Sequence, residues 1–196
     1  MKKRDLLFSL SFLCVFTSFA GDKIRIESPD KNLVCKIILN GPAGSAGNLY
    51  YELDYKSKPV IKRSVLGIIL KSPALQLNSF DLVEKNITTT DENWTPVWGE
   101  VKQIRNNYRQ LLLKLKTKDE ILVNMVFKLF NDGLGFRYEF PGQPKLNHFI
   151  VAEEVTQFAL TGNHKTFWIP GDYDTNEYAY YTSNLDEIDA TGGKFS

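Results

Sequence analysis

The sequence has few residues of the types that crosslink a chain or bind transition metals. It contains only two cysteines and two histidines among 196 residues. Cys14 lies in an N-terminal segment that we expect to be removed, so Cys35 has no partner for an internal disulfide. His148 and His164 are far apart and have no second ligand at a metal-binding spacing. We also find no nucleophile elbow, Cys-His arrangement or zinc spacing. The sequence therefore gives no sign of a disulfide scaffold, a zinc site or a nucleophilic hydrolase.

A long hydrophobic run is also missing. The most apolar segment, residues 6–16, is too short to span a bilayer permanently. It follows three basic residues at positions 2–4 and precedes the small residues Ser18 and Ala20. This is the pattern of a secretory signal peptide, and we expect cleavage after Ala20. The protein is therefore expected to be exported to a periplasm or to the outer surface of the cell.

An excess of charge of one sign is absent as well. Removing residues 1–20 takes away three basic residues and one acidic residue, so the formal charge falls from +1 to −1. A nearly neutral protein has no electrostatic footprint for nucleic acid or for an anionic membrane. The remaining 176 of the 196 residues are enough for one domain, which we place at 21–196.

The sequence does contain repeated signals for β-structure. Aromatic residues make up 13% of the chain, and few stretches have a helical period. The clearest signal is a hairpin over 121–140, in which Asn131-Asp132-Gly133 supplies a turn of residues that tolerate positive φ. Further strands are predicted at 23–28, 33–39, 49–55 and 65–70, with a bend at Lys58-Pro59 between the last two of these. The predicted class is an all-β protein built from antiparallel strands.

Two tryptophans lie four residues apart in the stretch Trp94-Thr95-Pro96-Val97-Trp98-Gly99-Glu100. They could form a platform on which a sugar ring stacks. They could equally close the end of a β-sandwich, which is the more frequent place for large aromatic side chains. Both interpretations stay open at this point.

A second unusual stretch runs from Phe167 to Tyr178. Trp168 precedes a Pro-Gly turn, and residues 172–177 then hold three carboxylates and one amide. Oxygen ligands at such close spacing suit calcium, although an aspartate-rich surface turn is the alternative. The spacing matches the first three ligands of an EF-hand loop but has Glu177 where that loop needs glycine. The stretch therefore cannot complete a calcium site by itself.

Taken together, these motifs resemble glycoside hydrolase family 97, a family of secreted α-glucosidases and α-galactosidases. The matching segments follow the family's order and are residues 94–100, 104–106 with Tyr108, 127–141, and 167–175 with Glu177 and Tyr178. The resemblance covers the family's N-terminal domain only. It implies an antiparallel β-sandwich of the galactose-mutarotase-like super-sandwich type. The weak tail at 189–196 stops before such a sandwich is complete, as in a fragment or a truncated reading frame.

The resemblance also implies how such a domain works. The catalytic carboxylates belong to a (β/α)8 barrel beyond Ser196, so no catalytic residue carries over to this chain. The N-terminal domain lends one glutamate to a calcium ion held mainly by the barrel, and the matching position is Glu177. We therefore expect a barrel partner, a calcium cofactor and an α-linked oligosaccharide substrate, with Trp168, Trp98 and Trp94 as candidate sugar contacts. The alternatives are a free-standing secreted carbohydrate-binding module and a sandwich that only supports a barrel.

Overall fold

A computed structural model describes residues 22–40, 47–171, 177 and 179–188 of the chain. The expected signal peptide with its cleavage site, the acidic residues Asp172 and Asp174, and the tail at 189–196 lie outside the described residues. Within the described ranges, no helix is long and apolar enough to cross a bilayer.

The described residues are almost entirely β-strand, and apart from one short 3-10 turn they contain no helix. The strands are β1 (Asp22–Glu27), β2 (Leu33–Asn40), β3 (Gly47–Tyr55), β4 (Lys58–Leu66), β5 (Ile68–Ser72), β6 (Leu75–Leu77), β7 (Ser79–Trp94), β8 (Ile104–Lys116), β9 (Leu122–Leu129), β10 (Leu134–Glu139), β11 (Ile150–Glu154), β12 (Lys165–Trp168) and β13 (Tyr181–Asn184); the 3-10 turn is η1 (Leu185–Glu187). Every strand pairing is antiparallel. The predicted all-β class is confirmed.

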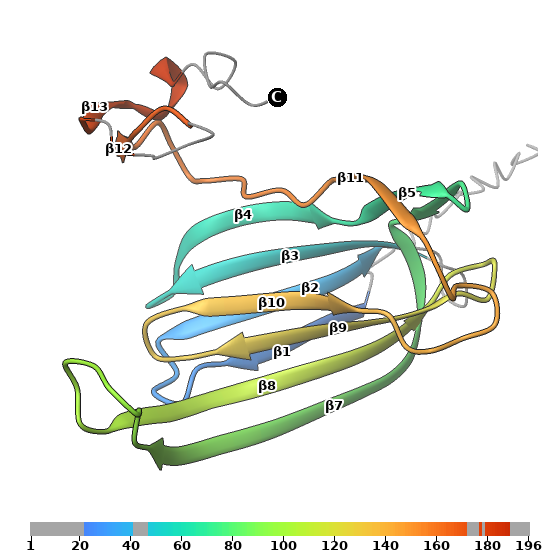
Figure 1. Ribbon diagram of the computed structural model, residues 1–196, viewed down its shortest axis with the longest axis horizontal. Helices are drawn as coiled ribbons and strands as arrows, with labels where there is room; N and C mark the ends of the chain where they lie inside the picture. The colour runs from blue at the N-terminus through green and yellow to red at the C-terminus, as the bar shows by residue number, and fades with distance from the viewer. Residues whose placement is uncertain (1–21, 41–46, 172–176, 178, 189–196) are drawn as a thin grey trace, which may run out of the picture.

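Two antiparallel meanders, β1–β4 and β7–β10, form the two layers of a sandwich (Figure 1). They are linked in one hydrogen-bonded path because β3 pairs with β7 at Gly47–Phe80 and Asn48–Ser79. Alternate side chains of both layers point inward and merge into a single buried cluster. Tyr51 of β3, for example, contacts the ring of Phe136 on β10, with 5.4 Å between ring centroids. The predicted antiparallel β-sandwich is therefore confirmed.

A third, smaller sheet contains β11, β5 and β6 and extends one edge of the β1–β4 layer. After β11, residues 155–160 continue along β4. The amides of Val155 and Gln157 donate to the carbonyls of Gly67 and Val65, each at 3.0 Å. The hairpin β12–β13 follows and stands apart from the sandwich (Figure 1).

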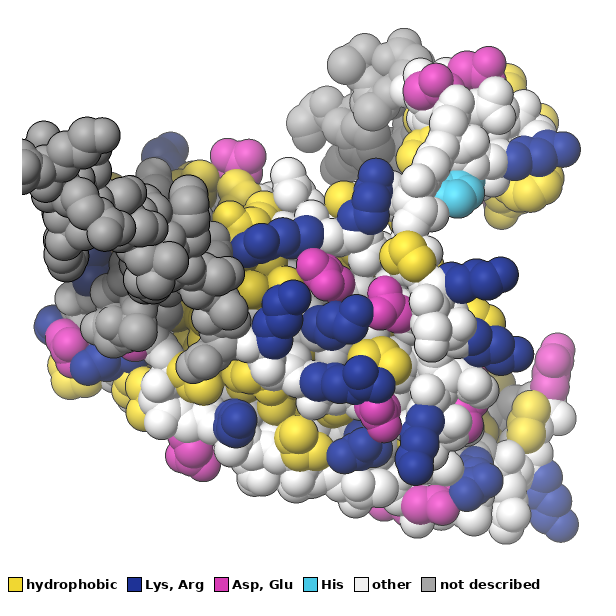
Figure 2. All heavy atoms as spheres, turned by 180° about the vertical axis from the view of Figure 1, so that it is seen from behind, with side chains coloured by type: hydrophobic (Ala, Val, Ile, Leu, Met, Phe, Trp, Pro, Cys, Tyr) yellow, Lys and Arg dark blue, Asp and Glu magenta, His cyan; other side chains and the backbone are white. Residues whose placement is uncertain are grey.

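The outer surface mixes charges of both signs. Figure 2 shows basic and acidic side chains interspersed over one face. Several of them pair on neighbouring strand positions, as Lys36 does with Asp54 and Lys114 with Glu84. Such a surface agrees with the near-neutral composition.

The hairpin over 121–140 is confirmed, but its turn forms differently from the prediction. The amide of Phe130 donates to the carbonyl of Gly133 at 2.9 Å, and no residue at 131–133 has a positive φ. The four-residue loop needs no left-handed residue.

The bend expected at Lys58-Pro59 is wrong. The chain reverses at Lys56-Ser57, where φ is 47° and 63°, and β4 already begins at Lys58. A two-residue hairpin loop with two positive φ values matches the right-handed twist of the strands that it joins.

Candidate functional site

The hairpin β12–β13 carries the stretch that the sequence singled out. Trp168 faces Tyr181 across the hairpin, and the two rings stack with their centroids 5.2 Å apart. The indole Nε1 of Trp168 donates to Ser183 Oγ at 3.0 Å, and Thr166 Oγ1 donates to the Ser183 carbonyl at 3.0 Å. Trp168 is therefore half-buried and braces the hairpin, whereas its neighbour Phe167 is 71% exposed.

The far end of the hairpin is closed by η1. The amide of Leu185 donates to the His164 carbonyl at 2.9 Å, and the Asn184 amide donates to Glu187 Oε2 at 2.8 Å. His164 Nε2 lies 3.1 Å from Thr161 Oγ1. These short-range bonds fix the end of the hairpin that lies opposite the Glu177 connection.

Glu177 lies in the connection between β12 and β13 and is exposed. The residues that match the first three ligand positions of an EF-hand loop, Asp172, Asp174 and Asn176, lie outside the described residues. Among the residues that the structure describes, no three His, Cys, Asp or Glu side chains are grouped to hold a metal ion. Calcium requires about six to eight oxygen ligands. The carboxylate of Glu177 has the chemistry of one such ligand.

Trp94 and Trp98 lie at the tip of a second projection, formed by the distal halves of β7 and β8. Trp94 is the last paired residue of β7, opposite Ile104, and is 50% exposed. Trp98 and Val97 in the loop that follows are 88% and 99% exposed. The interpretation that these tryptophans close the end of the sandwich core is therefore wrong. Their rings are accessible to a sugar or to a partner protein.

Polar pairs across the two strands brace this projection. Arg105 binds Asp91 through two hydrogen bonds of 2.8 and 2.7 Å, and Asn106 Nδ2 donates to Glu92 at 2.7 Å. The bonds from the Arg105 guanidinium lower the pKa of Asp91 below its usual value. The tip is thus held by the pairing of the ribbon and by these surface contacts, not by the core.

The buried ionisable groups have structural roles. Burial raises the pKa of Cys35 to about 12, and the nearby Asp54 carboxylate adds to the effect. Burial likewise raises the pKa of Tyr51 to about 12, and its hydroxyl donates to the Gln157 carbonyl at 2.8 Å. Tyr138 has a raised pKa for the same reason and lies 3.0 Å from Thr156 Oγ1. Both tyrosines attach the 155–160 segment to the sandwich.

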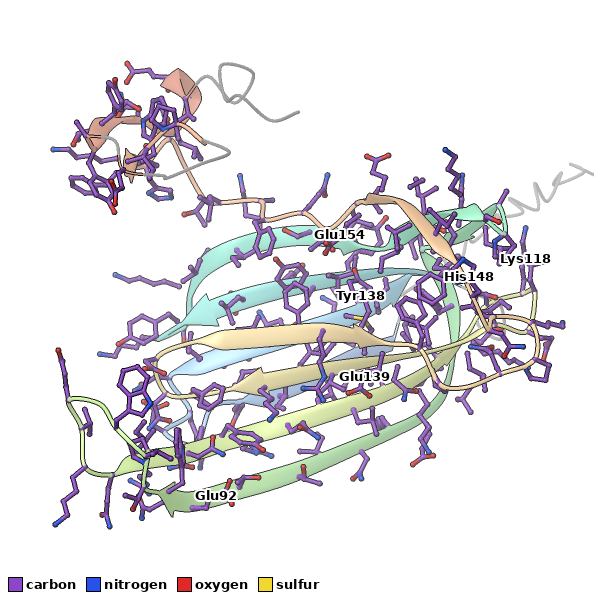
Figure 3. The ribbon with its side chains drawn as sticks, in the orientation of Figure 1. Glu92, Lys118, Tyr138, Glu139, His148 and Glu154 are labelled. Carbon is purple, nitrogen blue, oxygen red and sulfur yellow. The ribbon has the colours of Figure 1, made fainter. Side chains whose placement is uncertain are left out.

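Three of the acidic side chains lie on separate strands, and not as the close pair that glycosidase chemistry requires. Such a reaction needs two carboxyl groups about 5–10 Å apart around one bond. Figure 3 shows Glu92, Glu139 and Glu154 on three separate elements, β7, β10 and β11, with His148 before β11. Glu139 and Glu154 are also occupied by Arg137 and Thr156.

A shallow depression on the outer face of β9 and β10 was not found from the sequence. Its volume is about 210 Å³, and its lining consists of Val126, Lys128, Phe130, Gly135, Phe136 and Arg137. Lys128 lies over the ring of Tyr108 at 4.2 Å, and Tyr108 contacts Phe130 with 5.2 Å between ring centroids. Gly135 creates the opening, because a Cβ added there would meet no atom within 4 Å. Only the register of β9 against β10 brings these residues together, and a linear motif cannot show it.

Comparisons with known proteins agree with this architecture. The family described as Glycosyl-hydrolase 97 N-terminal matches residues 26–195. A glycoside hydrolase family 97 enzyme from Pseudoalteromonas sp. strain K8, solved in complex with panose, superposes with a TM-score of 0.75 and 30% sequence identity. This match covers 84% of the present chain and 25% of that enzyme. The same enzyme in complex with acarbose superposes with a TM-score of 0.73.

A retaining α-galactosidase from Bacteroides thetaiotaomicron is 24% identical over 200 residues, which cover 96% of this chain and 28% of that protein. A β-arabinopyranosidase shares the fold at 19% identity and a TM-score of 0.67. The chain therefore spans about a quarter of the length of these relatives.

The β-sandwich places the chain among the sandwich domains of glycoside hydrolases. The match over 26–195 is more specific: the chain belongs to glycoside hydrolase family 97 and corresponds to the N-terminal domain of its members. The family resemblance stated from the sequence is confirmed.

Proposed function

We propose that this chain is the N-terminal, non-catalytic domain of an exported, calcium-dependent α-glycosidase that hydrolyses α-linked oligosaccharides. The observation that carries the proposal is the β12–β13 hairpin of a family 97 sandwich, which is braced by a Trp168–Tyr181 stack and has Glu177 in its connection. The relatives support the substrate class, since one was solved with panose and acarbose and another is an α-galactosidase. The reaction itself belongs to a catalytic barrel that packs against this domain.

In this proposal, Glu177 supplies one carboxylate to a calcium ion whose other ligands come from the barrel. When bound, calcium would polarise the substrate or orient the catalytic groups. The chain's own contribution is positional. The Trp168–Tyr181 stack and the Trp168–Ser183 hydrogen bond fix both strands that flank the Glu177 loop.

The test uses the complete enzyme with its catalytic barrel and replaces Glu177 by alanine. We expect most of the activity to be lost and the affinity for calcium, measured by isothermal titration, to fall at least about tenfold, as for the loss of one charged ligand. Glu153→Ala, which removes an equally exposed carboxylate from β11, is the matched control and should change neither quantity. Near-normal turnover and calcium affinity in Glu177→Ala would refute the assignment.

A free-standing carbohydrate-binding module is the second candidate, and the exposure of Trp98 favours it. Affinity electrophoresis of the chain from residue 21 onward, on gels that contain starch or maltooligosaccharides, distinguishes the two functions. Retardation that Trp98→Ala abolishes and Val97→Ala preserves would support the module. Absence of retardation would support a domain whose site is completed by the barrel.

The mature N-terminus can be checked on the same material. We propose periplasmic or outer-surface export, so mass spectrometry of protein from the exported fraction should find the chain starting at Gly21.

A further inference from the structure

We propose that the two projecting hairpins are the two halves of one docking surface for the catalytic domain, and that they bind it jointly. One half is the β7–β8 tip, defined as Trp94, Val97, Trp98 and Ile104. The other half is the set of exposed aromatic residues on the β12–β13 hairpin, Phe167, Tyr180 and Tyr181. Because Trp168 pairs with Tyr181 and Phe167 with Thr182, Phe167 lies on the face opposite Tyr181, and the partner must contact both faces of the hairpin. The proposal rests on the proposed function, since it requires a catalytic domain, and it adds the surface and the mode of binding.

Both halves are unusually apolar for a solvated surface. Val97, Trp98 and Trp94 are 99%, 88% and 50% exposed at the tip. Tyr180, Phe167 and Tyr181 are 77%, 71% and 53% exposed on the hairpin. Clusters of exposed aromatic and aliphatic side chains usually mark a protein interaction site, whereas single exposed hydrophobic residues need no explanation.

Neither projection contains a buried core that its exposed apolar residues help to form. No residue of β12 or β13 is fully buried, and all the residues of β7 from Glu84 onward are exposed except Thr90. A two-stranded ribbon alone is at best marginally stable in water. The bracing contacts Arg105–Asp91 and Trp168–Tyr181 therefore hold in a defined shape two ribbons that lack a core. A body that covers them would supply the missing burial.

The two projections extend from the same end of the sandwich. In Figure 1 the β7–β8 loop and the β12–β13 hairpin both lie at the left end of the long axis, on opposite sides of it. Figure 2 shows the same arrangement from behind, at the right end. A partner that contacts both must be a folded body of domain size, because a short oligosaccharide or a peptide strand occupies a single groove.

The available area matches an interface between domains. If an aromatic side chain contributes about 150–250 Å² when buried, the exposed parts of the five aromatic residues amount to roughly 700 Å². This approaches the roughly 800 Å² per partner of a stable interface and lies in the range for domains within one chain. The relatives, of which this chain covers about a quarter, have the additional length for such a domain. Glu177 lies in the loop of the same hairpin, so docking there would bring it to the partner.

Hydrogen exchange followed by mass spectrometry tests the proposal, with this chain compared to the complete enzyme. We expect amides at 95–105 and in β12 and β13 to exchange at least about tenfold more slowly in the complete enzyme, while the core strand β9 is equally protected in both. Joint binding makes a sharper prediction for Trp98→Ser in the complete enzyme. This substitution at the β7–β8 tip should make the amides of β12 and β13 exchange faster, although Trp98 belongs to the other projection. Val97→Ser should act in the same direction, and its matched control Val83→Ser, 56% exposed at the other end of β7, should have no effect.

Unchanged exchange at both projections, in an enzyme that is active and binds calcium through Glu177, would overturn the docking proposal and leave the proposed function intact. If Glu177→Ala instead left activity and calcium affinity unchanged while Trp98→Ser still sped up exchange in β12 and β13, the proposed function would be refuted and the docking surface would stand. If the amides of the two projections were protected in this chain alone, and more so at higher protein concentration, the surface would bind a second copy and the proposal would be overturned. Protection of the tip by maltooligosaccharides alone, in this chain without a barrel, would overturn it in favour of a sugar site.

Discussion

Tyr51→Phe removes one hydroxyl that connects the sandwich to the segment leading into the hairpin. Tyr51 is fully buried, and its ring packs against Phe136 and Phe158 at 5.4 and 6.2 Å between ring centroids. Phenylalanine preserves these contacts. The losses are the 2.8 Å hydrogen bond to the Gln157 carbonyl and the hydrogen bond between the hydroxyl and the Ser64 side chain.

The expected cost at neutral pH is about 0.5–1.5 kcal/mol, the usual net contribution of one hydrogen bond, because Gln157 is exposed and water can replace the lost donor to its carbonyl. Urea unfolding followed by tryptophan fluorescence measures it, with the slope of the transition unchanged. Amides at 157 and 159, which bond to β4, should exchange faster. Tyr138→Phe is the control and should cost less, because Thr156 keeps its bond to Glu154 at 2.8 Å.

The same variant has a signature in alkaline solution. Folding raises the pKa of Tyr51 from 10.0 to about 12, so the folded state holds its proton more tightly than the unfolded state. This contribution is complete below pH 10 and is lost as the pH rises toward 12, which amounts to about 2–3 kcal/mol for two pKa units. Tyr51→Phe should therefore lose less stability than the wild type over that range. If Tyr51→Phe were as stable as the wild type at neutral pH and lost stability to the same extent between pH 10 and pH 12, the role given to this hydroxyl would be refuted.

Two further predictions concern the core. Cys35 is 0% exposed and its pKa is raised to about 12, so Ellman's reagent at pH 8 should label it only after unfolding; rapid labelling of folded protein would contradict its placement. Gly67→Ala should destabilise the fold by about 1–3 kcal/mol in thermal unfolding, because its Cβ would lie 2.9 Å from Asn78 Cβ and 3.0 Å from Val155 Cγ2. Gly142→Ala, where a Cβ meets nothing within 4 Å, is the control and should leave the melting temperature unchanged.

The sequence predicted those strands that have one buried face. The hairpin over 121–140 was found because Val123, Met125 and Phe127 alternate with side chains on the outer face. The long strand β7 was missed for the complementary reason. Its residues from Glu84 onward are exposed except Thr90, so the strand shows no alternation of buried and exposed residues with period 2. Lys56-Ser57 was missed as a turn because neither residue is of a type that favours positive φ.

The candidate site was predictable in its composition and not in its arrangement. Trp94 and Trp98 were singled out as candidate sugar contacts, but whether they were buried depended on where β7 and β8 leave the core, which is a property of the tertiary fold. Glu177 came from the family resemblance, because a single carboxylate has no recognisable spacing. The bracing of Trp168 by Ser183 could not be read from the chain either, since the two residues meet only through the register of β12 with β13.

The single link between β3 and β7 has a consequence for the order in which the chain folds. Each meander, β1–β4 and β7–β10, consists of strands that pair mainly with their neighbours in sequence, so each can assemble through short loop closures. Residues 22–66 therefore emerge from synthesis as a sheet whose inner face, including Ile26, Ile37 and Tyr51, has nothing to cover it until β7–β10 are complete. Over that interval the nascent chain presents a bare apolar surface, and this is the stage at which it most needs a chaperone.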